Sequence, residues 1–440
     1  MARTLAIKGS KKLLNAWAFY DWANSVYSLV ISSAIFPIFY GALFRVAEVE
    51  KVTILGSEIA RAPLISYVTS LAFVFIAIIT PLIAGISDYL GNKKLFLKIF
   101  CYLGALSCIG LYWFSLENIY FGLICYFFGL VGFWVSFAIN NSYLPDVAFP
   151  EQQDGISAKG FSLGYIGSVL LLLFNLAMVM QPDFFGITND GNEVAEMKAM
   201  KYSFVSVGIW WILFSQYTFY HLPKGNRTEG PRTNIVLNGF RELKMVWHQL
   251  GNEIILKKYL VAFFVFSTAV QTIMLIAAFY GEEEIAWGTD GERTKGLIIS
   301  ILLIQVVAIV GSIFTARLSR KNGNIPTLIL LNALWIFLCV YAYFLQTPMD
   351  FYIAAGLVGL VMGGIQTLAR STYSKLLPVT KDTTSFFSFY DVSEKIGLVI
   401  GTFIFGYITQ FTGSMRNATL FLGLLFLVGA LLLFRIKNVR

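Results

Sequence analysis

Long apolar segments alternate with short polar connections along the whole chain. An α-helix needs about 20 apolar residues to cross the hydrocarbon core of a bilayer, and these segments have that length or more. Twelve segments are predicted, at 13–43, 63–86, 95–115, 119–144, 156–180, 201–222, 258–281, 297–318, 326–346, 351–375, 385–410 and 417–435. The pattern therefore predicts an all-α integral membrane protein with twelve transmembrane helices.

The polar connections after the second and the eighth segment share one pattern. Each has a small residue at the end of an apolar segment, then a charged residue and then a glycine at the same spacing. These residues are Ala84, Asp88 and Gly91 in the first copy and Ala316, Arg320 and Gly323 in the second. A repeated connection between repeated apolar segments indicates a duplicated bundle, which is how many secondary transporters are built.

A more polar linker separates the two halves. Apolar residues recur in it at helical spacing, which is typical of an amphipathic helix on a membrane surface. They are Val236, Phe240, Leu243 and Trp247. The expected organisation is a six-helix bundle at 1–222, a cytoplasmic linker with this helix at 223–257 and a pseudo-symmetric six-helix bundle at 258–440.

The composition supports a membrane protein and argues against other classes. Hydrophobic residues make up 57% of the chain and charged residues 13%, whereas soluble domains have about 45–50% and about 25%. The four cysteines fall inside apolar segments, where we expect them to pack as small apolar side chains. With two histidines and no nucleotide-binding or hydrolase motif, we expect no enzymatic activity, no metal and no cofactor. The net charge of +8 belongs to the connections and does not indicate nucleic-acid binding.

The distribution of basic residues predicts the orientation. Lys and Arg gather in both tails, in the linker and in the connections after the second and eighth segments, whereas residues 182–200 and 282–295 are acidic. Short basic connections stay in the cytoplasm, so both termini and the linker are expected there. The connection at 146–154 departs from this pattern, because it has three acidic residues and no basic one. The first segment is too long for a signal peptide and lacks a small-residue cleavage site, so we expect it to stay as a span. The expected localisation is the inner membrane, with several spans.

Polar side chains within the apolar segments predict a central cavity, because such groups are costly in hydrocarbon unless they face protein or water. The third, sixth, ninth and twelfth segments are nearly free of them, so every third helix is expected to be peripheral. For the aromatic candidates, a role in packing or at the membrane interface remains an alternative. The candidate cavity residues are Tyr20, Asp21, Asn24, Asn141, Tyr165, Gln271, Gln366, Arg370 and Tyr390.

Glycines recur on one face of the fifth and of the eleventh segment. They are Gly160, Gly164 and Gly167 in the fifth, and Gly397 and Gly401 in the eleventh. Glycines at this spacing let helix backbones approach closely, and close packing explains them without any ligand contact.

Several stretches together resemble one transporter family. The connection after the second segment is similar to the loop signature of the major facilitator superfamily, although Ala84 stands at a glycine position and Asn92 at a basic one. Four other stretches resemble the vacuole-effluxer-like branch, whose bacterial members are often called the unknown-major-facilitator group. They are Phe19–Ser25, Leu144-Pro145 with Gly164–Gly167, Gly363–Ser371 and Phe386–Tyr390. The resemblance covers nearly the whole chain and implies a twelve-helix rocker-switch transporter; its eukaryotic relatives are associated with amino-acid efflux from vacuoles.

The repeated connections are expected to form a gate. The resemblance places at Asp88 an acid that docks against the start of a neighbouring helix, where unpaired N–H groups and the helix dipole favour a carboxylate. A solvated loop acid is the alternative. Gly91, Arg320 and Gly323 complete the predicted gating connections, and Lys93 and Lys94 are interpreted as determinants of topology.

The charged residues inside the segments are candidates for substrate binding or coupling. Asp21 and Arg370 either pair across the cavity, or Arg370 extends toward the interface. Asp391 and Lys395 are spaced as an intrahelical ion pair. Glu394 projects about 100° away from Lys395 on the helix and is predicted to have no partner in that pair. It is therefore the leading candidate for proton coupling, together with Asp391 and Lys395.

These features predict a secondary active transporter for a small polar solute, such as an amino acid or a short peptide-like molecule, with proton coupling. An exporter of amphiphilic compounds or drugs, and a membrane receptor or scaffold without transport, remain alternatives. The expected partners are a small-molecule substrate and the lipid bilayer, and we expect a monomer.

Overall fold

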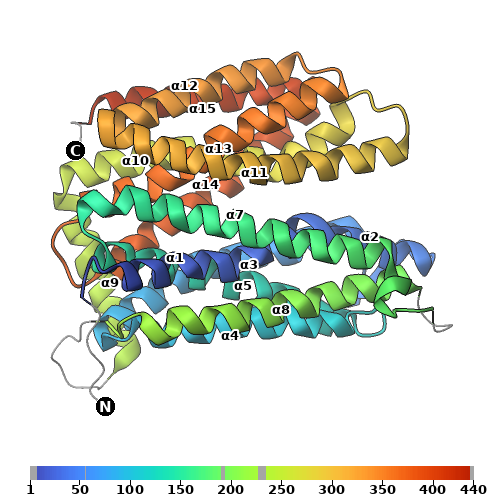
Figure 1. The fold of residues 1–440 in the computed structure, drawn as a ribbon, viewed down its shortest axis with the longest axis horizontal. Helices are drawn as coiled ribbons and strands as arrows, with labels where there is room; N and C mark the ends of the chain where they lie inside the picture. The colour runs from blue at the N-terminus through green and yellow to red at the C-terminus, as the bar shows by residue number, and fades with distance from the viewer. Residues whose placement is uncertain (1–6, 55, 190–193, 226–233, 437–440) are drawn as a thin grey trace.

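A computed structural model describes residues 7–54, 56–189, 194–225 and 234–436. Twelve long helical segments dominate it (Figure 1). The first is built from α1, η1 and α2 (Lys11–Val26, Tyr27–Ile35, Phe36–Val46), and the next are α3 (Arg61–Leu90), α4 (Lys93–Gly110), α5 (Ile119–Ser142), α7 (Pro150–Met180) and α8 (Ala195–His221). The others are α10 (Ile254–Glu284), α11 (Asp290–Asn322), α12 (Asn324–Tyr343), α13 (Pro348–Leu376), α14 (Thr383–Thr412) and α15 (Met415–Phe434).

Shorter elements connect these helices. They are β1 (Lys51–Ile54), β2 (Ser57–Ala60), η2 (Leu111–Trp113), α6 (Leu144–Val147), η3 (Pro182–Phe185) and α9 (Ile235–Asn252). The strands β1 and β2 form an antiparallel hairpin, which the sequence pattern did not predict. The first apolar segment also differs from a plain α-helix, because its middle part, Tyr27–Ile35, is a π-helix.

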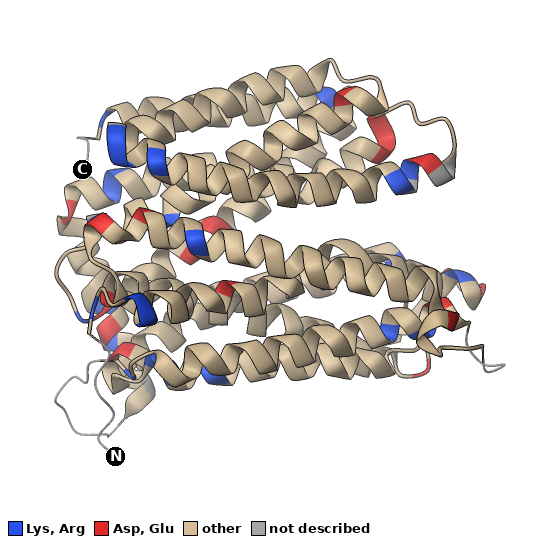
Figure 2. Ribbon diagram, in the orientation of Figure 1, with Lys and Arg blue, Asp and Glu red and all other residues tan. Residues whose placement is uncertain are grey.

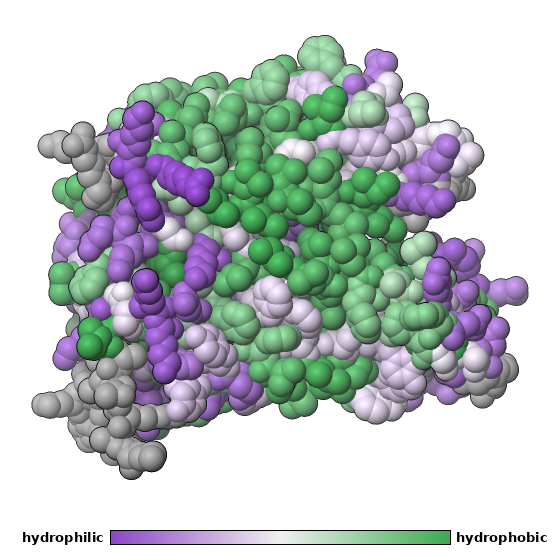
Figure 3. Space-filling view, in the orientation of Figure 1, coloured by the Kyte–Doolittle hydropathy of each residue, from purple (hydrophilic) through white to green (hydrophobic). Residues whose placement is uncertain are grey.

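The long helices form a molecule with an apolar belt. Eleven of them, among the described residues, are long and apolar enough to cross a membrane. The twelfth, α8, has 27 residues and packs beside α1 and α4. A hydrophobic band lies between hydrophilic ends (Figure 3). Large apolar side chains of the long helices are exposed, among them Leu71, Ile209 and Phe403. Such a surface would be unstable in water and fits lipid.

The helices fall into two groups that lie side by side, α1 to α8 in one bundle and α10 to α15 in the other (Figure 1). Their packing repeats: α1 contacts α7 and α8 in the first bundle, as α10 contacts α14 and α15 in the second. Between the bundles, α3 packs on α14 and α7 packs on α11. This repetition is the pseudo-symmetry expected of two six-helix bundles. The exact boundaries at 222 and 258 stay a prediction.

Glycines permit the closest of these contacts. A Cβ atom at Gly164 would meet Ser25 of α1, and one at Gly401 would meet Thr272 of α10. The glycine faces of α7 and α14 thus serve helix packing, as expected from their spacing.

The helix α9 lies across the end of the molecule that holds both termini, which we call the terminal face (Figure 1). It packs on α3, where Gly239 faces Gly85 and Ile86. Its buried positions, among the described side chains, are Gly239, Glu242, Val246 and Leu250. The helix is therefore present, and two of its predicted apolar residues, Phe240 and Trp247, are 54% and 59% exposed. The side chain of Val236 lies outside the described residues.

Candidate substrate cavity and gate

A cavity of about 130 Å³ lies between the two bundles. Its described lining comes from the first helical segment, α5 and α7 on one side and from α10, α11, α13 and α14 on the other. The helices α4, α8, α12 and α15, which correspond to the segments expected to be peripheral, contribute no described residue to it. Both polar and aromatic side chains form the walls. They include Ser168, Trp134, Tyr165, Gln271, Gln366, Arg370, Tyr390 and Glu394.

The predicted cavity residues do not all reach the cavity. Asn141, Tyr165, Gln271, Gln366, Arg370 and Tyr390 line it. Tyr20, Asp21 and Asn24 are not part of its described lining, because their side chains are buried within the protein; the Tyr20 ring packs near that of Phe219. The polar residues of α1 are spread over more than one face, and the sequence spacing alone did not separate them.

Asp21 and Arg370 join the two bundles through a buried ion pair. The Arg370 Nη1 atom lies 3.1 Å from Asp21 Oδ2 and 2.9 Å from Asn141 Oδ1. Its Nε and Nη2 atoms donate to the hydroxyl and carbonyl oxygens of Ser157, at 3.0 and 2.9 Å. The guanidinium group lies close to the rings of Trp17 and Phe161. Of the two options left open by the sequence, Arg370 therefore pairs across the bundles and does not extend to the interface.

Asp391, Glu394 and Lys395 of α14 form one cluster. Lys395 Nζ lies 3.3 Å from Asp391 Oδ1 and 2.9 Å from Glu394 Oε2. The prediction that Glu394 has no partner in this pair was therefore wrong, since the long lysine side chain bends to reach the adjacent residue. Glu394 also accepts a hydrogen bond from Gln271 of α10. Lys395 itself is buried against the ring of Trp134.

A tyrosine and a glutamine connect the walls across the cavity. The Tyr165 hydroxyl of α7 donates to Gln366 Oε1 of α13 at 2.8 Å. Tyr390 stacks on Phe263 of α10, with ring centroids 4.0 Å apart. These two tyrosines thus have defined positions in the lining.

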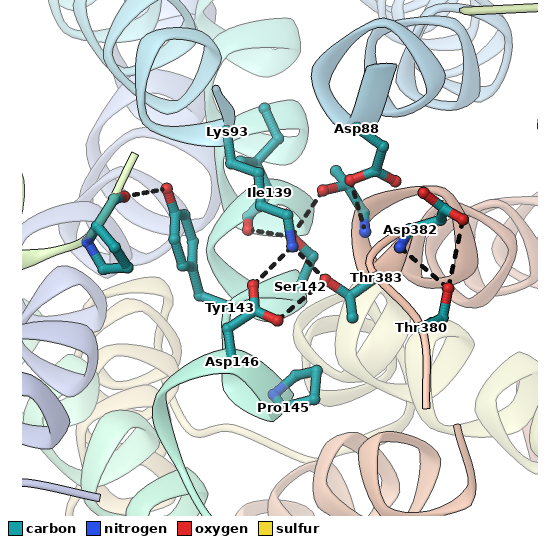
Figure 4. A network of polar contacts seen from close by, with 12 residues as sticks. Asp88, Lys93, Ile139, Ser142, Tyr143, Pro145, Asp146, Thr380, Asp382 and Thr383 are labelled. Carbon is teal, nitrogen blue, oxygen red and sulfur yellow. Dashed lines mark hydrogen bonds and ion pairs between the residues drawn. The ribbon is translucent and has the colours of Figure 1, made fainter. Parts of the chain in front are cut away.

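Asp88 belongs to a polar network that includes the start of α14 (Figure 4). Its carboxylate accepts hydrogen bonds from the backbone N–H groups of Ser385 and Thr384, at 2.7 and 3.4 Å. These groups belong to the first turn of α14, where free N–H groups and the helix dipole favour an anion. Asp88 is 3% exposed, so a solvated loop acid does not describe it. Gly91 ends α3 with a φ of 60°, a left-handed conformation that glycine adopts readily.

Lys93, which was predicted to be a determinant of topology, also belongs to this polar network. It is 3% exposed, lies 2.7 Å from Asp146 Oδ2 and donates to the Thr383 hydroxyl of α14 (Figure 4). Lys94 is also buried and donates to the carbonyl oxygen of Leu222. The ion pair explains part of the acidic connection at 146–154: Asp146 offsets a lysine from another connection.

A second set of contacts lies at the other inter-bundle interface. Asp154 of α7 lies 2.7 Å from Lys375 Nζ of α13, and it accepts hydrogen bonds from Asn324 and Ser319 at 2.9 and 3.1 Å. Asp154 is 3% exposed. Sequence reasoning missed this site, because its members come from separate helices. Arg320, the predicted counterpart of Asp88, is exposed and lies over Gly155. Gly323, between α11 and α12, has a φ of 89°.

The carboxylates near Asp88 include one from α9. Burial and the neighbouring Asp382 raise the pKa of Glu242 to about 7, with Asp88 adding to the shift.

Charged residues gather toward the two ends of the bundles, and few lie between (Figure 2). Polar contacts of Asp88, Lys93, Asp154 and Arg370 join residues of the two bundles. A notch separates the bundles at the face opposite to the terminal face (Figure 3).

The fold and the cavity define a membrane transporter of the major facilitator class. In comparisons with solved structures, the chain matches the fucose transporter FucP in its outward conformation with a TM-score of 0.72, at 17% identity over 97% of this chain and 99% of that one. It matches the proton:xylose symporter XylE with a TM-score of 0.67, at 13% identity over 96% and 95% of the two chains.

The family model described as "Vacuole effluxer Atg22 like" matches residues 9–440, and the chain belongs to this family. An uncharacterized MFS-type transporter of Bacillus subtilis, YxiO, is 30% identical over 97% of this chain and 95% of its own length. Autophagy-related protein 22 of Eremothecium gossypii is 26% identical over 69% of this chain and 62% of its own length.

Proposed function

We propose that the protein is a secondary active transporter that moves a small polar solute, such as an amino acid or a short peptide-like molecule, by alternating access. The observation that carries this proposal is the cavity between two packed bundles, bridged on one side by Asp21 and Arg370. We further propose that the terminal face is cytoplasmic and that the protein lies in the inner membrane of a bacterial cell. The structure then corresponds to a state with a closed cytoplasmic gate.

Coupling to protons is proposed to occur at Asp391, Lys395 and Glu394. Two carboxylates share one ammonium group there, and such a site accepts a proton without creating an isolated buried charge. XylE, which shares this fold, is a proton:xylose symporter and gives one example of proton use by such an architecture.

A second substrate class is supported by the cavity walls. Six phenylalanine and tryptophan side chains contribute apolar surface to the lining, which favours amphiphilic solutes or drugs as cargo. They are Phe133, Trp134, Phe137, Phe161, Phe263 and Phe266.

The test is transport by purified protein in proteoliposomes. A thermal-shift screen of amino acids, short peptides and amphiphilic amines first identifies solutes that raise the melting temperature. We expect these solutes to exchange across the liposome membrane and a pH gradient to accelerate their uptake. Ser168→Trp, which fills the cavity, should block exchange, whereas Gly406→Trp adds the same side chain where there is open space. Stable ligand binding without any flux would contradict transport and support the receptor alternative.

A further inference from the structure

The charges that reach the cavity are unequally available to a substrate. Arg370 and Glu394 are the charged side chains in its described lining. The Arg370 side chain is 1% exposed and that of Glu394 is 14% exposed. A solute in the cavity therefore meets the carboxylate of Glu394 more readily than the guanidinium group.

Arg370 is already engaged by the protein. Its Nε and Nη2 atoms donate to Ser157, and its Nη1 atom donates to Asp21 and Asn141. The aromatic rings of Trp17 and Phe161 lie against the guanidinium group. The Asp21 carboxylate also offsets its charge. A substrate carboxylate could pair with Arg370 only after these buried contacts were broken, which is costly.

Lys395 is engaged in the same way. It is 2% exposed, contacts two carboxylates and has the Trp134 ring close to its ammonium group. With all three groups ionised, the cluster has two negative charges against one positive charge, so it carries one excess negative charge. The neutral pair of Asp21 and Arg370 leaves this excess uncompensated within the lining.

The surroundings of Glu394 suit a positively charged nitrogen. Gln271 orients the carboxylate by a hydrogen bond. Tyr390 precedes Glu394 by four residues, so the two lie on the same face of α14, and both line the cavity. Trp134 also lines the cavity beside the cluster. Aromatic faces attract cations, and they also provide apolar contact for the rest of a solute.

We propose that Glu394 binds a cationic nitrogen of the substrate, and that the substrate is a small amine with an apolar body whose carboxylate, where it has one, finds no cationic partner. This inference rests on the transport function proposed above and narrows its substrate class. For an amino acid or a short peptide-like molecule, it implies recognition at the ammonium end.

Three probes of similar size and different charge test this proposal. They are phenethylamine, phenethyl alcohol and phenylacetate, which are positive, neutral and negative. Isothermal titration of the purified full-length protein should show binding of phenethylamine and weaker or no binding of the other two. Glu394→Gln keeps the size of the side chain and should weaken phenethylamine binding about 10- to 100-fold, the effect of losing one charge-assisted hydrogen bond. Glu394→Asp keeps the charge and should retain most of the binding.

A matched control and a folding check complete the design. Glu283→Gln makes the same chemical change at an exposed position and should bind like the wild type. Melting temperatures report whether each variant is folded; should Glu394→Gln not fold, the comparison of the three probes on the wild type decides. Equal affinity for the three probes, no binding of phenethylamine at millimolar concentration, or unchanged affinity in folded Glu394→Gln overturns the proposal.

The same design separates this inference from the transport proposal. Binding in detergent that is selective for charge and dependent on Glu394, without any flux in proteoliposomes, supports the site and contradicts transport. Flux of a solute that is unaffected by Glu394→Gln supports transport and contradicts the site.

Discussion

Arg370 of α13 and Asp21 of α1 lie 3.1 Å apart with both side chains 1% exposed, and they connect the two bundles beside the cavity. Neither charge has access to water, so each depends on the other for neutralisation. The pair is therefore a lock between the bundles as well as a support for the cavity wall.

The first prediction concerns this lock. Arg370→Met should destabilise the protein by about 3–5 kcal/mol, because it leaves the Asp21 carboxylate buried without a counter-charge. The double variant with Asp21→Asn should recover a large part of this loss, since both charges are then absent. Thermal and denaturant unfolding in detergent measure the effect as a double-mutant cycle. Additive losses would show that the two residues act independently.

The second prediction concerns the gate at Asp88. Asp88→Asn should open the terminal face more often, because a neutral amide accepts the α14 N–H groups more weakly than a carboxylate. A Ser142→Cys reporter is suited to this interface, because Ser142 is fully buried with its Oγ atom 3.4 Å from the Thr384 hydroxyl. All four native cysteines are buried and form no disulfide. Labelling of the reporter by a membrane-impermeant maleimide should become about tenfold faster if the gate loses about 1.4 kcal/mol.

The control for this experiment is Asp183→Asn, which changes an aspartate near the opposite face. It should label like the parent reporter. Equal labelling of the Asp88 variant and the control would show that Asp88 does not hold the gate closed.

The third prediction concerns pH. In this structure the pKa of Glu242 is raised to about 7, mainly by burial and by the neighbouring Asp382. The charge of Asp88 on α3 adds to this increase, and Lys93 partly offsets the charge of Asp88. Opening of the gate would separate Glu242 from Asp382 and Asp88, and the pKa of Glu242 would return toward its ordinary value. Between that value and about pH 7 the closed gate then binds more protons than the open one. Acidification should therefore favour the closed gate, and a rise in pH through about 7 should weaken it.

The Ser142→Cys reporter also measures this effect. Its labelling, divided by that of an exposed Lys11→Cys variant to correct for thiol ionisation, should increase with pH in the parent and stay low and flat with Glu242→Gln. A pH profile that is the same with and without Glu242→Gln would assign the dependence to other groups.

The positions of the helices were predictable because each crosses an apolar medium and must be apolar over its length. The observed bounds of α3, α10 and α14 exceed the predicted segments by a few residues at each end, where the polar ends leave the membrane. The β-hairpin at Lys51–Ala60 lies outside the apolar segments, where hydropathy carries no signal.

A residue of the site could be predicted only where its type and its place in the sequence indicate a single physical role. The docking of Asp88 against the start of a neighbouring helix was implied by the resemblance to the major facilitator loop signature. The buried contacts of Lys93 were not predicted, because a lysine next to a membrane segment is also the usual signal of topology. The contact between Asp154 and Lys375 joins residues 221 positions apart, and no local pattern reports such a pair.

The last prediction uses two glycines of α14 as a matched pair. A Cβ atom at Gly401 would collide with Thr272 and Thr268 of α10, whereas one at Gly406 would meet open space. Gly401→Ala should therefore force α10 and α14 apart and destabilise the protein by about 1–3 kcal/mol, as overpacking does. Gly406→Ala should be neutral or stabilising by up to about 1 kcal/mol, because alanine favours the helix. Because α14 carries both the gate contact at Ser385 and the cluster at Glu394, Gly401→Ala should also lower transport. Melting temperature and flux measured on the same preparations check both effects, and equal behaviour of the two variants would show that the close approach of α10 and α14 is not needed.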